Sequence, residues 1–288
     1  MSADLGESLS QNNFKINKRI FSATSWIIAS ALIIYFPPLW LFTLVVTVMN
    51  AIALSELFAL AKDRNIPVHS WTGFSAGLAT PIFTYLVAMQ LIPIQSLEQL
   101  DGLLVAGILF ALFVAQATRR ENKLALVIVG VTFLSVFYVS WFFSFLIKLR
   151  VRPEGAHLVA FLLLVTKGSD IGGYLIGSRF GSHRLIPRIS PNKSVEGFLG
   201  GLVVSLSAAF FCQFILSKQP LWHLLGLGLV LGVISQFGDL AESIIKRDCQ
   251  VKDSGTIIPG MGGMLDLVDS LLLTAPLFYY WVVWVWRL

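Results

Sequence analysis

Residues 238–270 gather charged side chains in a sequence that is otherwise strongly apolar. A charged group at membrane depth is costly to bury, so such groups usually mark a functional site. This segment combines acids that can hold a metal ion with bases that can neutralise phosphate charge. The six acids and three bases are Asp239, Glu242, Asp248, Asp253, Asp266, Asp269, Lys246, Arg247 and Lys252.

The first polar side chains of this segment share one face of a helix. Offsets of three, four, seven and eight residues place Asp239, Glu242, Ser243, Lys246 and Arg247 along that face. The helix follows a long apolar run, so we expect its end to enter a polar cavity. A solvated helix end with ion pairs four residues apart is the alternative. That alternative explains Asp239 least well, because Asp239 lies directly behind the apolar run.

Asp266 and Asp269 lie three residues apart at the expected start of the last long apolar helix. Carboxylates at this spacing point the same way and repel each other when nothing lies between them. A Mg²⁺ ion resolves that conflict, because it binds carboxylate oxygens and often joins one or two of them to substrate phosphates. The alternative is that each acid only favours the positive end of the helix dipole.

Three glycines, Gly260, Gly262 and Gly263, come just before those two carboxylates. Glycine lets backbone N–H groups approach a ligand closely, and the N-terminus of the following helix favours anions. Lys252 precedes the glycines and can offset phosphate charge. We therefore predict phosphate binding here, with a simple turn as the alternative.

A second polar segment, residues 167–197, ends in a proline-set turn that carries Lys193. We expect Lys193 to contact a triphosphate if this turn and the carboxylates share one membrane face. Gly172, Gly173 and Gly177 in the same segment indicate close helix packing. Outside both segments, Glu56 stands within an apolar run, and we expect it to be paired inside the bundle.

The rest of the chain has the composition of an integral membrane protein. Of its 288 residues, 56% are hydrophobic and 13% charged, which does not fit a soluble globule. The net charge of +5 is spread over many loops, so we expect no binding of nucleic acid. Two cysteines and four scattered histidines give neither a disulfide framework nor a zinc spacing.

Apolar runs of membrane-spanning length predict an all-α fold, a polytopic integral membrane helix bundle with about nine transmembrane helices. We divide the chain into a polar cytoplasmic N-terminal segment (1–20), N-terminal membrane helices that act as a scaffold (21–155), and C-terminal catalytic membrane helices with cytoplasmic loops (156–288). The expected spans are 21–36, 38–60, 71–92, 102–118, 124–147, 156–177, 197–216, 221–243 and 267–286.

The distribution of Lys and Arg predicts an orientation. With the N-terminus inside the cell, most of these residues face the cytoplasm, as topology normally requires. The basic cluster at 148–152 falls on the other side and counts against this orientation. The same orientation places residues 178–196 and 244–266 together at the cytoplasmic face.

The motif SIIKRDCQVKDSGTIIPGMGGMLDLVDS, residues 243–270, resembles the C-terminal motif of the phosphatidate cytidylyltransferases, also called CDP-diacylglycerol synthases. Upstream, residues 170–174, 177–181 and 189–197 are also similar to that family, so the specific resemblance covers 167–271. Two positions depart from the family pattern. Met261 replaces a histidine, and Leu267 replaces a basic residue.

The resemblance implies condensation of CTP with phosphatidate to give CDP-diacylglycerol and pyrophosphate. It implies Mg²⁺ as cofactor, with room for a second cation. Together with the chemistry of the side chains, it assigns metal binding to Asp239, Asp266 and Asp269. It further assigns catalysis to Ser243, Lys246 and Asp253, and substrate binding to Lys193, Arg247, Lys252, Gly260, Gly262 and Gly263.

The expected partners are CTP, phosphatidate and the lipid bilayer, and a homodimer is left open. The resemblance also implies an integral protein of a bacterial inner (cell) membrane, with its active site facing the cytoplasm. Because of Met261 and Leu267, one alternative is a related protein that acts on another lipid phosphate or is catalytically weakened. A cation-coupled transporter is another alternative, although repeated halves with broken helices are typical of transporters.

Overall fold

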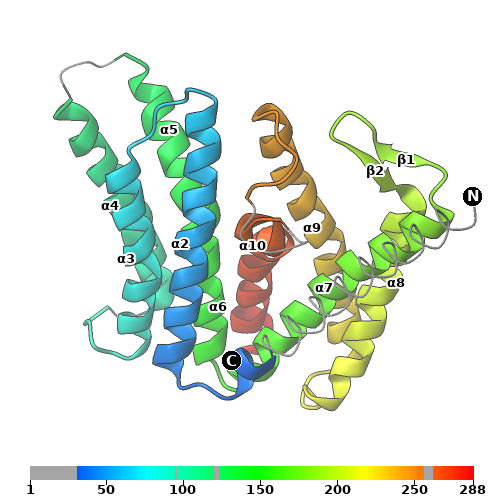
Figure 1. Cartoon of the computed structure of the whole chain (residues 1–288). Helices are drawn as coiled ribbons and strands as arrows, with labels where there is room; N and C mark the ends of the chain where they lie inside the picture. The colour runs from blue at the N-terminus through cyan, green and yellow to red at the C-terminus, as the bar shows by residue number, and fades with distance from the viewer. Residues whose placement is uncertain (1–30, 95, 120–122, 256–261) are drawn as a thin grey trace, which may run out of the picture.

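The computed structural model describes residues 31–94, 96–119, 123–255 and 262–288, and these residues are almost entirely helical (Figure 1). A short antiparallel hairpin, β1 (Arg184–Ile186) and β2 (Ser190–Ser194), is the one sheet among them. The long helices are α2 (Leu39–Asp63), α3 (Ser70–Ala88), α4 (Leu97–Ala117), α5 (Ala125–Val136), α6 (Phe142–Val151), α7 (Gly155–Phe180), α8 (Val195–Phe211), α9 (Leu221–Asp248) and α10 (Met264–Trp281). Short non-α turns join or extend them at Phe137–Trp141, Cys212–Phe214 and Val282–Trp286.

Seven helices in the described part of the chain are long and apolar enough to cross a membrane. The predicted class, an all-α polytopic membrane protein, is therefore confirmed. The predicted count of about nine is approximate. The expected span 71–92 forms α3, which contains Pro81 and is not among the seven. In the expected span 21–36, residues 21–30 lie outside the described part of the chain, and residues 31–35 are helical.

α10 lies between two groups of helices (Figure 1). It contacts α2 and α6 of the first group and α7 and α9 of the second. Its side chains Phe278 and Tyr279 are fully buried, with Phe161 against the first and Phe145 against the second. The helix that carries two of the predicted metal ligands is thus held in the middle of the molecule.

α7 and α8 approach each other closely because small residues face each other. A Cβ built on Gly172 would lie 2.6 Å from the Val204 side chain, and one on Gly200 would lie 2.6 Å from Ile176. Gly177 is similarly close to Gly197. The predicted packing role is confirmed for Gly172 and Gly177, whereas a Cβ on Gly173 would meet the carbonyl oxygen of Gly197 at an ordinary 3.5 Å.

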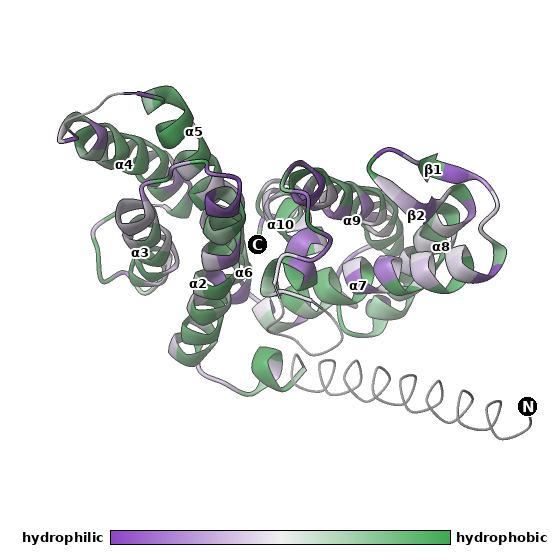
Figure 2. Cartoon of the chain, turned by 45° about the horizontal axis from the view of Figure 1, so that its top comes forward, coloured by the Kyte–Doolittle hydropathy of each residue, from purple (hydrophilic) through white to green (hydrophobic). Residues whose placement is uncertain are grey.

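The two polar segments meet at one end of the bundle. Arg247 Nε, at the end of α9, donates to the carbonyl oxygen of Ile189 in the hairpin at 3.3 Å. Figure 2 shows hydrophilic residues along this hairpin and along the segment beside α10. The shared location is as predicted. Which side of the membrane this end faces stays a prediction.

The basic cluster at 148–152 is largely neutralised inside the bundle. Lys148 is fully buried and pairs with Asp101, and Arg152 pairs with Glu98 at 3.2 Å. These pairs do not remove the objection to the predicted orientation, because topology follows the number of Lys and Arg residues, and Asp and Glu count for little. The orientation stays a prediction.

Candidate active site

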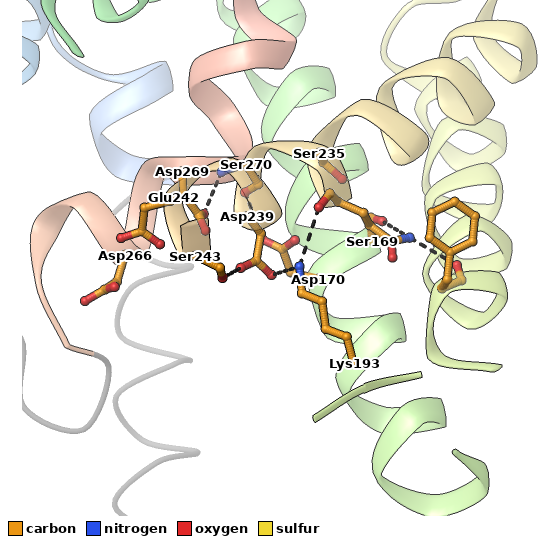
Figure 3. A network of polar contacts seen from close by, with 12 residues as sticks. Ser169, Asp170, Lys193, Ser235, Asp239, Glu242, Ser243, Asp266, Asp269 and Ser270 are labelled. Atoms are coloured by element: carbon orange, nitrogen blue, oxygen red, sulfur yellow. Dashed lines mark hydrogen bonds and ion pairs between the residues drawn. The ribbon is translucent and has the colours of Figure 1, made fainter. Parts of the chain in front are cut away.

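Three carboxylates from two helices converge at the centre of the polar end (Figure 3). Asp239 and Glu242 lie one turn apart on α9, and Asp269 lies on α10. One oxygen from each lies within 4.8 Å of the others. The helices can approach this closely because α9 has Gly238 at the contact, where a Cβ would lie 2.7 Å from the backbone oxygen of Asp269.

This cluster fits a divalent cation. Glu242 and Asp269 are buried, and among the described residues neither oxygen of Glu242 accepts a hydrogen bond, although Lys246 forms an ion pair with it at 2.6 Å. Carboxylate oxygens are the ligands that Mg²⁺ takes. The carboxylate group and the ion pairs attached to it have four acids against two bases, which leaves two formal negative charges: Asp239, Glu242, Asp266 and Asp269 against Lys193 and Lys246.

Lys193 links the hairpin to the acidic cluster. It begins from β2, and its Nζ lies 2.7 Å from Asp239 Oδ2. Ser243, one turn beyond Asp239, has its hydroxyl 3.5 Å from Asp239 Oδ1. An ammonium group beside a carboxylate that can hold a metal ion is able to bind a phosphate attached to the same ion.

α7 adds a second group of polar side chains to the site. Lys167 Nζ donates to Asp170 Oδ2 at 2.9 Å and to Ser270 Oγ at 2.8 Å. The Ser270 hydroxyl is 2.9 Å from the same Asp170 oxygen, and the Ser270 N–H donates to Asp269 Oδ1 at 2.5 Å. α7 is thereby tied to the start of α10 beside the acidic cluster.

Asp266 lies beside the three-carboxylate group and has other partners. Its Oδ1 pairs with Lys246 at 2.6 Å. Its Oδ2 accepts from the N–H groups of Gly263 at 2.7 Å and Ser254 at 2.9 Å, and from the Ser254 hydroxyl at 3.0 Å. Gly262 has a φ of +96°, and a Cβ there would lie 2.5 Å from this carboxylate. The backbone thus wraps Asp266 at the N-terminus of α10.

A pocket of about 550 Å³ opens next to Asp239 and Asp170. The hairpin supplies Arg184, Asn192 and Lys193 to its wall, and α7 and α8 supply Tyr174 and Phe198, among other residues. One side of the pocket is therefore cationic and polar, and another is aromatic. A larger cavity of about 780 Å³ lies at the far end beside Glu98 and Arg152, and no member of the acidic cluster lines it.

Comparison with known proteins places this site in a family. The model of the cytidylyltransferase family matches residues 17–285, which is nearly the whole chain. The chain belongs to the cytidylyltransferase family. The expected family membership, drawn from the motif at 243–270, is confirmed.

Curated relatives within the family carry a more specific name. The phosphatidate cytidylyltransferase of Bacillus subtilis (strain 168) is 35% identical over 245 residues, which cover 83% of this chain and 87% of the relative. That of Staphylococcus aureus (strain COL) is 34% identical over 252 residues, covering 86% and 93%. The uncharacterized protein YnbB of Escherichia coli (strain K12) is 42% identical over 128 residues, covering 44% and 43%.

The geometry arranges the predicted site residues of this cytidylyltransferase in three ways. Asp239 and Asp269 lie in the central cluster, with Ser243, Lys193 and Lys246 in contact with its members. Arg247 instead donates to backbone carbonyls of Ile189 and Val251, and Lys252 and Asp253 are exposed. Gly262 and Gly263 lie against carboxylates, whereas Gly260 and Met261 lie outside the described residues.

Four residues at this end of the bundle were not assigned to the site from the sequence. Glu242 is three residues after Asp239, so the sequence showed that both lie on one face of the helix. Its distance from Asp269 depends on how α10 crosses α9, which the sequence does not show. Lys167 and Asp170 carried the same signal on α7, three residues apart within an apolar helix. Arg184 lines the pocket, and only its place in a basic loop pointed to it.

The second family departure has a clear structural setting. Leu267 packs against the hydrophobic core at the start of α10. A leucine is stable in that place without a polar partner, since it loses contact with water on packing. Asp269, the member of the acidic cluster on α10, lies two residues beyond Leu267, and the cluster does not use position 267.

Proposed function

We propose that this cytidylyltransferase is a phosphatidate cytidylyltransferase, which condenses CTP with phosphatidate to form CDP-diacylglycerol and pyrophosphate. The observation that carries the proposal is the Asp239–Glu242–Asp269 cluster beside a lysine-lined pocket, in a membrane protein of this family. The names of the two relatives that match most of this chain support the same reaction.

Phosphoryl chemistry of this kind asks mainly for positioning and charge neutralisation. The attacking group is a phosphate oxygen of the lipid, which is already ionised and needs no strong base. This agrees with a site built from carboxylates, lysines and serines. Lys193, in the pocket wall beside Asp239, is the proposed group that neutralises phosphate oxygens. Ser243, Lys246 and Asp253 keep the catalytic roles predicted from the motif.

Mg²⁺ is the proposed cofactor, and Asp239, Glu242 and Asp269 are the residues that would hold it. When bound, the cation would supply Lewis-acid stabilisation of the CTP phosphates during transfer of the cytidylyl group. Asp266, predicted from the sequence as a ligand, is linked to Glu242 by Lys246, which pairs with both carboxylates, and its metal-binding role stays a prediction. A second cation and a homodimer stay predictions as well.

The pocket beside Asp239 is proposed to take the phosphates of a substrate. Arg184 and Lys193 give it positive charge next to the acidic cluster, and Lys252 and Arg247 remain predicted phosphate contacts at the same end. Because CTP is a cytosolic metabolite and phosphatidate is a lipid, the site must open both to water and to the bilayer. We propose that this end faces the cytoplasm of a bacterial inner membrane.

The decisive experiment supplies the purified protein with Mg²⁺, CTP and a panel of lipid phosphates. We expect pyrophosphate release that depends on phosphatidate, with CDP-diacylglycerol as the lipid product. Pyrophosphate release with another lipid phosphate, and none with phosphatidate, would replace phosphatidate as the proposed substrate. If no member of the panel caused pyrophosphate release, the proposed enzymatic activity would be wrong, and a catalytically weakened relative or a transporter would be favoured.

A further inference from the structure

Glu56 is a buried carboxylate that α2 directs toward the active-site end of α10. Its side chain is 6% exposed, although it stands in the half of the chain predicted to be a scaffold. Oε1 accepts from the Met264 N–H at 2.9 Å, and Oε2 accepts from the Leu265 N–H at 2.8 Å. Both donors belong to the first turn of α10, where helix N–H groups have no partner within the helix.

Two glycines that precede α10 lie against this carboxylate. A Cβ built on Gly255 would lie 2.6 Å from Glu56 Oε1, and one built on Gly263 would lie 2.6 Å from Oε2. Any larger residue would therefore force the carboxylate and the backbone apart. These two glycines make room for a side chain of the protein itself.

Ser254 connects Glu56 directly to the site. Its hydroxyl lies 3.2 Å from Glu56 Oε2 and 3.0 Å from Asp266 Oδ2. Asp266 in turn pairs with Lys246, and Lys246 pairs with Glu242 of the acidic cluster. A continuous chain of polar contacts thus runs from α2 to the proposed cation site.

The other end of the segment is held by α2 as well. Arg64, the residue directly after α2, donates from Nε to the carbonyl oxygen of Asp248 at 2.6 Å, and its Nη2 donates to the same oxygen. Asp248 is the last residue of α9. A cation at a helix C-terminus and an anion at a helix N-terminus are each electrostatically favourable.

We propose that Glu56 is a positioning residue of the active site. With Arg64, it clamps both ends of the segment that joins α9 to α10, and so it fixes the height and rotation of the first turn of α10. Asp266 lies in that turn and Asp269 in the next one, so the position of the turn sets the positions of both carboxylates. The N-terminal half is therefore a part of the site's geometry, and the C-terminal helices do not form the site by themselves.

The test compares Glu56→Gln and Glu56→Ala with a matched control, Glu98→Gln. Glu98 is also a carboxylate from the N-terminal half that bonds to α10, but at its far end, where it accepts from the Tyr279 hydroxyl at 2.8 Å. Each variant is purified in lipid nanodiscs. Hydrogen–deuterium exchange is then measured over residues 249–270, together with turnover and the Mg²⁺ dependence of turnover.

We expect the amides of Met264 and Leu265 to exchange at least about tenfold faster in Glu56→Gln, and faster still in Glu56→Ala, because their acceptor is weakened or lost. We expect kcat to fall about ten- to a hundredfold, since a small displacement of reacting groups has effects of that size. The Mg²⁺ concentration for half-maximal turnover should rise. Glu98→Gln should leave exchange over 249–270 and the Mg²⁺ dependence as in the wild type.

Unchanged exchange in Glu56→Ala would overturn the proposal, and so would turnover within twofold of the wild type. An equal effect of Glu98→Gln would show general destabilisation and would also overturn it. Only the turnover readout rests on the proposed function. If the wild type failed to use CTP and phosphatidate, the exchange of Met264 and Leu265 would still decide whether Glu56 holds α10.

Discussion

At the residue scale, Asp269 has the surroundings of a metal-binding carboxylate. It is buried between α9 and α10, and one of its oxygens accepts from the Ser270 N–H. Its charged neighbours are the acids Asp239 and Glu242 of the cluster, together with Asp170 and one base, Lys167. A buried group of like charges is unfavourable unless a cation or proton compensates it.

The change Asp269→Asn should separate metal binding from folding. Asparagine keeps the shape and can still accept the Ser270 N–H, so we expect the protein to insert and fold normally. Turnover should fall by about a hundredfold or more, because a hard anionic ligand is lost. The measurement is pyrophosphate release over a Mg²⁺ titration, with thermal unfolding as the folding control. Near-normal turnover in Asp269→Asn would remove this residue from the proposed cation site.

Lys193 gives the residue-scale prediction for substrate binding. It reaches both the pocket wall and Asp239, so Lys193→Ala should raise KM for CTP by about tenfold, the loss of roughly one charge-assisted contact. Lys218→Ala is the matched control, because Lys218 is an exposed lysine at the far end that pairs with Glu154. An unchanged KM in Lys193→Ala, or an equal change in both variants, would contradict the role in substrate binding.

The sequence predicted which residue types form the site, but it predicted only in part which of these side chains contact one another. Helical spacing alone placed Asp239, Ser243 and Lys246 on one face, and all three meet the acidic cluster. The choice between Glu242 and Asp266 as the third acid of the cluster was not open to such reasoning. It depends on the crossing of α9 and α10 and on the backbone that wraps Asp266.

At the scale of elements, the contact between α9 and α10 sets the distance between the acids. Gly238 lies at this contact, and its missing side chain lets α9 approach the backbone of Asp269. Apolar run lengths predicted both helices well, because a membrane span is marked by its composition. The sequence does not reveal which glycine is used for close approach and which one merely faces lipid.

Gly238→Ala and Gly226→Ala test that distinction on one helix. The new Cβ at residue 238 would lie 2.7 Å from a backbone oxygen, so α9 and α10 must separate. We expect a loss of about 1–3 kcal/mol in stability, as for overpacked cores, together with a drop in turnover. At residue 226 nothing lies within 4 Å of the added Cβ, and alanine favours helix. Thermal unfolding and turnover should therefore be unchanged or slightly improved in Gly226→Ala.

Equal behaviour of the two alanine variants would contradict the role assigned to Gly238. A loss of turnover without a loss of stability in Gly238→Ala would still support it. In that case the helices would have moved by a few tenths of an ångström, which is enough to alter the distances between the carboxylates. A readout of Mg²⁺ dependence would then show the displacement directly.

At the scale of the whole molecule, polar chemistry collects at one end of an apolar bundle. The ends of α2, α7 and α9 and the starts of α8 and α10 meet there, from both halves of the chain (Figure 1). Hydropathy and charge sorting predicted this gathering for residues 178–196 and 244–266. They could not predict that α2 joins this end through Glu56, because a single carboxylate in an apolar run does not show which helix it contacts.

The remaining whole-molecule question is which side of the membrane this end faces, and the two cysteines allow a direct test. Cys249 follows α9 at the active-site end and is partly exposed, whereas Cys212 is buried. In a Cys212→Ala background, we expect a membrane-impermeant maleimide to label Cys249 in inverted vesicles and not in intact cells. The added residue in Ser217→Cys, at an exposed position of the opposite end, should give the reverse pattern when Cys249 is replaced by alanine.

The labelling rate must be interpreted with the chemistry of the thiol in mind. Burial, and then the neighbouring Asp248 carboxylate, raises the pKa of Cys249 above its usual value. Since the thiolate is the reactive form, its share rises with pH, and labelling in inverted vesicles should accelerate from neutral to alkaline pH. Intact cells should stay unlabelled at every pH, because access and not ionisation protects the residue there. Labelling of Cys249 in intact cells would place the site outside the cytoplasm, where CTP does not reach it, and the proposed orientation would be wrong.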